Sequence, residues 1–151
     1  MDIIHDNAAD LSALNGKTVA VIGYGAQGRA QALCMRDSGV NVIIGVRPGK
    51  SFDAAAQDGF QADIIHILLP DESHGAVYEA EIKPHLKAGK TLCCSHGFAY
   101  VFNTIVPPAD VDVIMVAPKG PGTEVRRVFE EGFGCPGLIA VHQNPSGKAR
   151  D

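Results

Sequence analysis

The sequence of this protein predicts an α/β fold, with a mostly parallel sheet that carries helices on both faces. Three observations lead to this prediction. The chain has 151 residues, the usual size of one domain around one hydrophobic core. Short β-branched runs alternate along it with segments of helical character. Glycine is the one unusual component, with 17 residues, and several glycines stand where a predicted strand ends.

The first predicted strand, helix and strand follow one another within about thirty residues. Residues 17–22 read KTVAVI, a β-branched run typical of a buried parallel strand. Residues 26–37 are rich in helix formers, and Gly39 stands where a helix C-cap is expected. Residues 41–46 form a second β run. This order indicates a βαβ unit.

The later part of the chain continues the alternation up to residue 141. Residues 102–105 fit neither class, and residues 144–151 are polar and helix-prone. Arg126 and Arg127 are expected to be exposed on the last helix. The remaining predicted elements are a possible helix at 52–57, a buried strand at 63–69, a helix at 73–86, a strand at 91–95, a strand at 111–117, a helix at 123–131 and a strand at 137–141.

Charge and hydropathy exclude several kinds of partner. The chain has 13 Lys and Arg against 17 Asp and Glu, a formal net charge of −4, so no global field draws it to nucleic acid or to an anionic membrane. Its apolar runs are far shorter than the roughly 20 residues that a membrane span needs, and the acidic N-terminus is unlike a signal peptide. We therefore expect a cytoplasmic protein with no nucleic-acid and no membrane partner.

The cysteines point to a reducing compartment rather than to a disulfide framework. There are four, irregularly spaced, and the neighbours Cys93 and Cys94 lie inside an apolar run, where they are expected to be buried. No CxxC or HExxH pattern occurs, so a structural zinc site is not expected.

A glycine-rich turn follows the first predicted strand and opens the first helix. Residues 23–28 read GYGAQG, the GxGxxG pattern in the context that gives it meaning. Gly23 would make the tight turn, Gly25 would let the backbone approach a pyrophosphate, and Gly28 would allow close packing of helix on strand. The alternative is a glycine-rich packing turn without a ligand. The motif favours a dinucleotide and a Rossmann-like, doubly wound arrangement of the sheet.

The end of the second predicted strand indicates which dinucleotide is bound. NAD-binding folds usually place an acid about 20 residues after the glycines, and no acid stands there. The segment instead offers the guanidinium of Arg47, the ammonium of Lys50 and the hydroxyl of Ser51, groups that suit a 2′-phosphate. NADPH is therefore favoured over NADH, with a solvated basic turn as the alternative.

Polar residues follow three other predicted strands, at the edge where doubly wound sheets bind their ligands. They are residues 71–74, His96 and Lys119. An imidazole and an ammonium at neighbouring strand ends can polarise or protonate an oxygen of a substrate. The alternatives are a loop histidine bonded to backbone and a surface lysine. Four further histidines are expected to be structural or merely exposed: His5, His66, His85 and His142.

Several long motifs together resemble one known family. They are GYGAQGRAQALCMRDSGVNV, GVRPGKS, ILLPDESH, SHGF, VPPADVDVIMVAPKGPG and VRRVFEEGFGCPGLIAVHQ. The chain is similar to the N-terminal, NADPH-binding domain of ketol-acid reductoisomerase, and the resemblance covers nearly its whole length. It implies a magnesium-dependent enzyme that shifts an alkyl group in 2-acetolactate or 2-aceto-2-hydroxybutyrate. Reduction with NADPH then gives a 2,3-dihydroxy acid, on the route to valine, leucine and isoleucine.

The resemblance also implies roles for individual residues. His96 corresponds to the residue assigned as catalytic, and Lys119 to a lysine near the metal-bound substrate. The positions that match coenzyme contacts are Tyr24, Gly25, Ala26 and Gln27 in the phosphate loop, Arg47 with Lys50 or Ser51 at the 2′-phosphate, Asp71, Glu72, Ser73 and His74 in a further loop, and Gly122.

Two departures from the family pattern shape the expected domain organisation. Residues 1–143 would be the N-terminal NADP-binding domain, and residues 144–151 the start of a second, helical and knotted domain that holds Mg²⁺ and builds a homo-oligomer. The chain alone, without metal ligands, is expected to be inactive. Family members also have about ten further residues between residues 61 and 62, and residues 58–62 alone are too short for a crossover, which needs about ten residues or more. The alternative function is a stand-alone NADP-binding module without catalysis.

Overall fold

The computed structural model describes residues 10–45 and 62–150, and its strands form one six-stranded sheet in the order β2-β1-β3-β4-β5-β6. The first five strands in chain order run parallel, and β6 pairs antiparallel with β5. The strands are β1 (Thr18–Ile22), β2 (Asn41–Gly45), β3 (Ile64–Ile67), β4 (Thr91–Cys94), β5 (Asp112–Pro118) and β6 (Gly137–Gln143).

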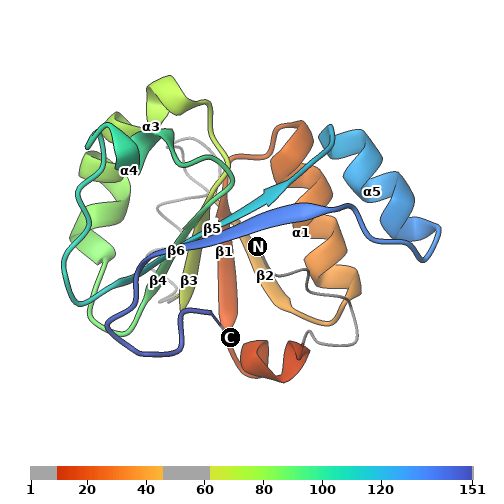
Figure 1. The fold of residues 1–151 in the computed structure, drawn as a ribbon, viewed down its shortest axis with the longest axis horizontal. Helices are drawn as coiled ribbons and strands as arrows, with labels where there is room; N and C mark the ends of the chain where they lie inside the picture. Colours follow the sequence, from red (N-terminus) through yellow and green to blue (C-terminus); the bar gives the residue numbers. More distant parts are fainter. Residues whose placement is uncertain (1–9, 46–61, 151) are drawn as a thin grey trace.

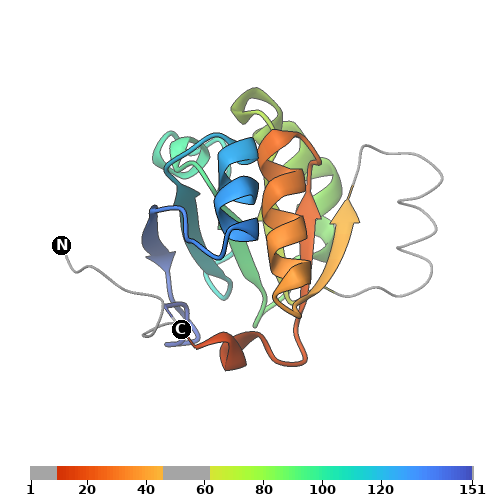
Figure 2. The same ribbon diagram turned by 90° about the vertical axis from the view of Figure 1, so that its right-hand side faces the viewer.

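Helices cover both faces of this sheet (Figures 1 and 2). On one face α1 and α5 lie side by side, and on the other lie α3, α4 and the turns that follow α3. The predicted doubly wound, mostly parallel sheet is thus confirmed. The helical elements are the 3₁₀ turn η2 (Leu11–Leu14), α1 (Ala26–Asp37), α3 (Asp71–Val77), the π turn η3 (Tyr78–Ile82), the 3₁₀ turn η4 (Lys83–His85), α4 (Phe98–Val101) and α5 (Gly122–Glu130).

The strand order fixes where a ligand can bind. From β1 the chain crosses to β2 on one side and then to β3 on the other, so the connections diverge between β1 and β3. In doubly wound sheets the crevice outside the carboxyl ends of the strands at such a point is the binding site. The described residues that follow β1, β3, β4 and β5 therefore belong to one edge of the sheet.

The central strands are buried on both faces, as their apolar runs predict. In β1, Val19 and Val21 pack with Ala32 of α1, whereas Ala20 faces the opposite cluster around Tyr78. This alternation is the two-residue period of a strand. Helix α1 ends at a C-cap where Gly39 adopts a φ of +84°, as expected from the sequence.

The predicted helix at 73–86 differs from the structure in its start and in its regularity. It begins two residues earlier, at Asp71, and passes into π and 3₁₀ turns after Val77. Pro84 explains part of this change, because it lies in the final 3₁₀ turn and has no N–H to continue an α-helix. The possible helix at 52–57 lies outside the described residues.

Two segments later in the chain, residues 102–105 and residues 144–150, form turns. In residues 102–105 the chain turns through Asn103, whose φ of +55° is one that asparagine tolerates. The expectation of helix for residues 144–151 is wrong for the described part, 144–150. There the carboxylate of Asp112 accepts hydrogen bonds from the amide and hydroxyl of Ser146, and Gly147 has a φ of +74°.

One surface prediction is wrong and one core prediction is confirmed. Arg127 is exposed as predicted, but the side chain of Arg126 is only 19% exposed, because it lies between α5 and α1 and pairs with Asp37. Cys93 and Cys94 are both buried free thiols. Burial raises the pKa of both thiols, to about 11 for Cys94, so neither behaves as a reactive thiolate.

Candidate functional site

Two of the three motif glycines serve the packing of the turn between β1 and α1. Gly23 has a φ of +102°, and a Cβ there would lie 2.7 Å from the carbonyl oxygen of Leu68. A Cβ on Gly28 would overlap the carbonyl oxygen of Gly23. Both positions therefore exclude any side chain, in agreement with the tight turn predicted at Gly23 and the close packing predicted at Gly28. Their contact with a coenzyme stays a prediction.

Gly25 stands in a different environment. It caps the N-terminus of α1, and a Cβ placed on it would meet no atom within 4 Å. Its neighbours Tyr24 and Ala26 are exposed as well. The space above Gly25 is therefore open, next to the free N–H groups of the first turn of α1, and an anion can approach the backbone there. These residues fit a pyrophosphate.

This contrast between Gly25 and Gly28 gives a paired prediction. Gly28→Ala should lower the free energy of unfolding by about 2 kcal/mol, because the new methyl group meets backbone that cannot yield. Gly25→Ala should fold normally but bind the dinucleotide about tenfold more weakly, since its methyl group occupies the open space. Urea unfolding and coenzyme titration of both variants check this. Equal losses of stability would contradict the assignment.

A cleft of about 350 Å³ opens at the carboxyl edge of the sheet, beside the glycine turn. Its walls come from the start of α1, the segment after β3, the segment after β4, and the end of β5. The residues that line it are Gly25, Ala26, Gln27, Ile67, Leu68, Leu69, Pro70, Asp71, His74, Ser95, His96 and Pro118. The predicted phosphate loop, Asp71 and His96 are thus brought to one cleft.

The segments after β3 and β4 meet across this cleft through a short contact between two side chains. Nδ1 of His96 lies 2.7 Å from Oδ2 of Asp71. The His96 side chain is 66% exposed, and its ring is nearly parallel to that of Phe98, with 6.4 Å between the ring centroids. An imidazole held in this way on a cleft wall can exchange a proton with a bound molecule.

The four residues predicted for the further coenzyme loop form the first turn of α3 and have different environments. Glu72 is exposed, while Asp71 and Ser73 are half-buried. His74 is only 2% exposed, and its Nε2 donates a hydrogen bond to the carbonyl oxygen of Leu69, 2.8 Å away. His74 therefore supports the loop from inside, and its contact with a coenzyme stays a prediction.

The segment after β5 lies against the start of α1. Lys119 is exposed, and its amide donates to the carbonyl oxygen of Pro136, 2.7 Å away. Gly122 is buried, and a Cβ there would overlap the carbonyl group of Ala26. Gly122 is thus the point where α5 touches the phosphate loop, a packing role that the sequence does not indicate.

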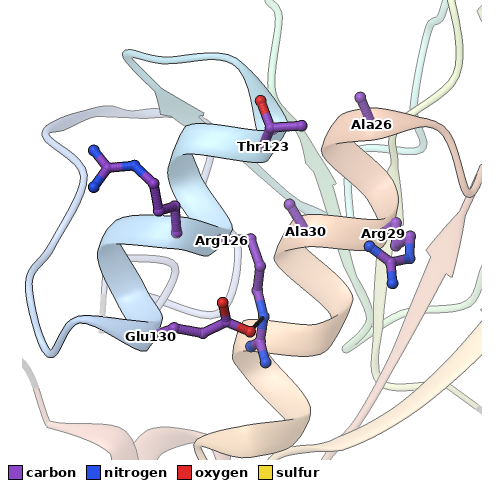
Figure 3. Close-up of a pocket in the computed structure, with 8 residues that line it drawn as sticks. Ala26, Arg29, Ala30, Thr123, Arg126 and Glu130 are labelled. Atoms are coloured by element: carbon purple, nitrogen blue, oxygen red, sulfur yellow. Dashed lines mark hydrogen bonds and ion pairs between the residues drawn. The ribbon is translucent and has the colours of Figure 1, made fainter.

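The two helices that meet at Gly122 also enclose a smaller cavity of about 190 Å³ (Figure 3). Arg126 of α5 crosses toward α1, where it pairs with Asp37 at 2.6 Å, and it pairs within α5 with Glu130 at 2.8 Å. Arg29 points away from α5 in this view. Arg126, which lies between the two helices, is therefore already paired with two carboxylates.

A chain of side-chain amides connects the glycine turn with the end of β4, and sequence reasoning missed it. Nε2 of Gln27 donates to the carbonyl oxygen of Gly120, 2.7 Å away. Nε2 of Gln31, one helical turn later, donates to Oε1 of Gln27 at 3.2 Å and to Oγ of Ser95 at 3.3 Å. The spacing of the two glutamines was the one signal available, because residues four apart share a helix face.

Ser95, the residue before His96, fixes the proton positions in this network. Its hydroxyl donates to the carbonyl oxygen of Val116 at 2.7 Å, so its oxygen must accept from Gln31 and from Nε2 of His66, 3.3 Å away. His66 thus carries its proton on Nε2. Burial lowers the pKa of His66 to about 4, so the ring is neutral. His66 is structural, as predicted.

The remaining predicted positions are three histidines and the basic segment after β2. His85 and His142 are exposed, in agreement with the prediction that they are either structural or merely exposed. The ring of His142 lies beside the ring of Tyr100. His5, Arg47, Lys50 and Ser51 lie outside the described residues. Among residues 10–45 and 62–150, no three His, Cys, Asp or Glu side chains gather in a way that could hold a metal ion.

The described helices are those of residues 10–45 and 62–150. In that part of the chain, no helix is both long and apolar enough to cross a bilayer.

Comparison with known proteins finds a family whose sequence profile covers most of the chain. A sequence profile described as acetohydroxy acid isomeroreductase, NADPH-binding domain, matches residues 13–151. A ketol-acid reductoisomerase (NADP(+)) from Akkermansia muciniphila is 94% identical over 161 residues, covering 100% of this chain and 49% of that protein. A ketol-acid reductoisomerase (NAD(+)) from the uncultured archaeon GZfos26G2 is 56% identical over 167 residues, covering 100% of this chain and 50% of that protein.

Solved structures agree with the sequence matches. An NADH-preferring ketol-acid reductoisomerase from an uncultured archaeon superposes with a TM-score of 0.88 at 57% identity, covering 99% of this chain and 50% of that one. A semialdehyde dehydrogenase NAD-binding protein from Cupriavidus necator gives a TM-score of 0.65 at 18% identity, covering 87% of this chain and 55% of that one, which shows a shared fold alone.

The lengths of these matches bear on the domain organisation. The chain spans about half the length of the curated relatives it matches. The alignment with the Akkermansia protein is 161 residues long against 151 in this chain, so it contains ten positions that the chain lacks. Their place between residues 61 and 62, and the boundary at residue 143, stay predictions.

Proposed function

Because this chain belongs to the family of acetohydroxy acid isomeroreductase NADPH-binding domains, we propose that it is the coenzyme-binding half of a ketol-acid reductoisomerase. The substrates would be 2-acetolactate and 2-aceto-2-hydroxybutyrate, and the products the corresponding 2,3-dihydroxy acids. The observation that carries this proposal is the cleft in which the open glycine turn at Gly25 and the imidazole of His96 face the same space.

Each wall of the cleft has a task in this function. The start of α1 holds the pyrophosphate through backbone N–H groups at Gly25, Ala26 and Gln27. NADPH, when bound, supplies the hydride. His96 holds and moves a proton at Nε2, next to an oxygen of the substrate. Lys119, exposed after β5, adds a positive charge on the same edge of the sheet.

We propose none of the described residues as a ligand of the magnesium ion that the family uses. Asp71 is engaged with His96, and no group of three metal-binding side chains occurs in residues 10–45 and 62–150. In line with the resemblance to the family, we propose that a second, helical domain supplies the Mg²⁺ ligands, and we expect no turnover from the present chain by itself. The full enzyme would be a cytoplasmic homo-oligomer.

A coenzyme titration tests the proposal and its choice of NADPH. Fluorescence titration of this chain should give an affinity at least about tenfold higher for NADPH than for NADH, since Arg47, Lys50 and Ser51 suit a 2′-phosphate. The NADP(+) name of the 94% identical relative supports this choice, while the 56% identical archaeal relative is named for NAD(+).

Arg47→Ala provides the matched control for this titration. It should remove most of the preference by weakening NADPH binding while leaving NADH binding unchanged, because NADH has no 2′-phosphate. Tighter binding of NADH by the unaltered chain would refute the choice of coenzyme. Failure to bind either coenzyme would refute the proposed function itself.

A further inference from the structure

We propose that Asp71 is a positioning residue that fixes the tautomer and the orientation of His96 in the cleft. What His96 does once positioned rests on the proposed function. The contact itself does not, because it is the 2.7 Å distance between Oδ2 of Asp71 and Nδ1 of His96.

The chemistry of the two groups determines where the proton lies. An ionised carboxylate presents only lone pairs, so at 2.7 Å a proton on Nδ1 of His96 is favoured over a second lone pair at that nitrogen. In the neutral imidazole the second nitrogen, Nε2, then carries a lone pair and no proton. This is the form that can take a proton from an oxygen and return it, and the cleft is the space that both residues line.

His96 needs such a partner because little else holds its ring. Its side chain is 66% exposed, and the ring of Phe98 flanks it at 6.4 Å without a polar contact. Without Asp71 the ring would be free to rotate and to exchange its tautomers. The carboxylate is therefore the group in the described residues that turns an exposed histidine into an oriented one.

Asp71 stands in a well-defined place at the start of α3. It is the first residue of α3, and Pro70 before it accepts a hydrogen bond from the amide of Ser73 at 2.9 Å. Beneath it, Nε2 of the buried His74 lies 2.8 Å from the carbonyl oxygen of Leu69 and 3.9 Å from Oδ1 of Asp71. The hydrogen bond from His74 to Leu69 therefore supports the segment that carries Asp71.

A mere surface ion pair would contribute little and would not select a tautomer, so the tautomer is the decisive readout. Long-range ¹H–¹⁵N correlation spectra of this chain show which ring nitrogen of each histidine carries the proton. We expect His96 to be protonated on Nδ1 when neutral. Asp71→Ala should abolish this selection, and Asp71→Asn should retain part of it, because the amide oxygen can still accept.

Glu79→Ala is the matched control, since it removes an exposed carboxylate from the same helical stretch, where Glu79 pairs with Lys83. It should leave the His96 tautomer unchanged. The amide spectrum of each variant reports whether it is folded. A proton on Nε2 in the unaltered chain, or an unchanged tautomer in folded Asp71→Ala, would overturn the proposal, and the first of these needs no variant.

Turnover separates this inference from the proposed function. In the full-length enzyme Asp71→Ala should lower kcat about tenfold, part of the 10²–10⁴-fold that general acid–base catalysis contributes, with a smaller change in KM. An Nδ1 proton on His96 in a chain that binds no NADPH would refute the proposed function and uphold the positioning. A normal kcat together with a lost tautomer would refute the catalytic part alone.

Discussion

Acidification is expected to lower the free energy of unfolding of this protein by about 3 kcal/mol between pH 6.5 and pH 4, through the buried side chain of His66. Burial lowers the pKa of His66 from 6.5 to about 4 in the folded state. Between these values the unfolded chain binds a proton that the folded chain does not. The stabilisation is therefore complete above pH 6.5 and is lost as the pH falls toward 4.

Two variants isolate this contribution from the carboxylates that titrate in the same range. His66→Gln keeps a donor nitrogen near Oγ of Ser95 but cannot gain a proton, so its stability should depend less on pH than that of the unaltered chain. His142→Gln removes an exposed histidine and should leave the pH dependence as it was. Urea unfolding across this pH range is the measurement. Parallel curves for the His66 variant and the unaltered chain would contradict the prediction.

The parts of the fold that the sequence predicted are those set by local rules. Helix α1 has the predicted bounds, because a glycine turn opens it and Gly39 closes it. The strands lie where β-branched runs predicted them, with ends that differ by one or two residues. The roles of Gly23 and Gly28 followed from the motif, because each serves a contact only a few residues away or on the neighbouring strand.

The parts that the sequence could not predict depend on residues far apart in the chain. Gly122 touches Ala26, and Gln31 reaches Ser95, only because α5 and β4 are brought beside α1 by the topology. The burial of His74 is similar: its neighbours in sequence read as an exposed polar loop, while the packing of α3 turns this one side chain inward. Such contacts carry no periodicity and no spacing that a single sequence displays.

The contact between His96 and Asp71 is another one between residues far apart in the chain. A substitution of His96 is the second change for which we expect a large effect. In the full-length enzyme His96→Ala should lower kcat by about 10²–10⁴-fold, since it removes the group that moves the proton. NADPH affinity should change little, because the open glycine turn at Gly25 is untouched. Single-turnover kinetics and coenzyme titration measure the two quantities separately.

His85→Ala is the control for this experiment, because His85 is exposed in the 3₁₀ turn η4 and does not line the cleft. An unchanged kcat in His96→Ala would remove His96 from the mechanism and leave the cleft as a binding site. A parallel loss of kcat and NADPH affinity would make it a coenzyme ligand. We expect His96→Ala to lower kcat alone, and by a larger factor than Asp71→Ala does. This order is expected if His96 carries the proton and Asp71 orients it, because the carboxylate can act only through the imidazole.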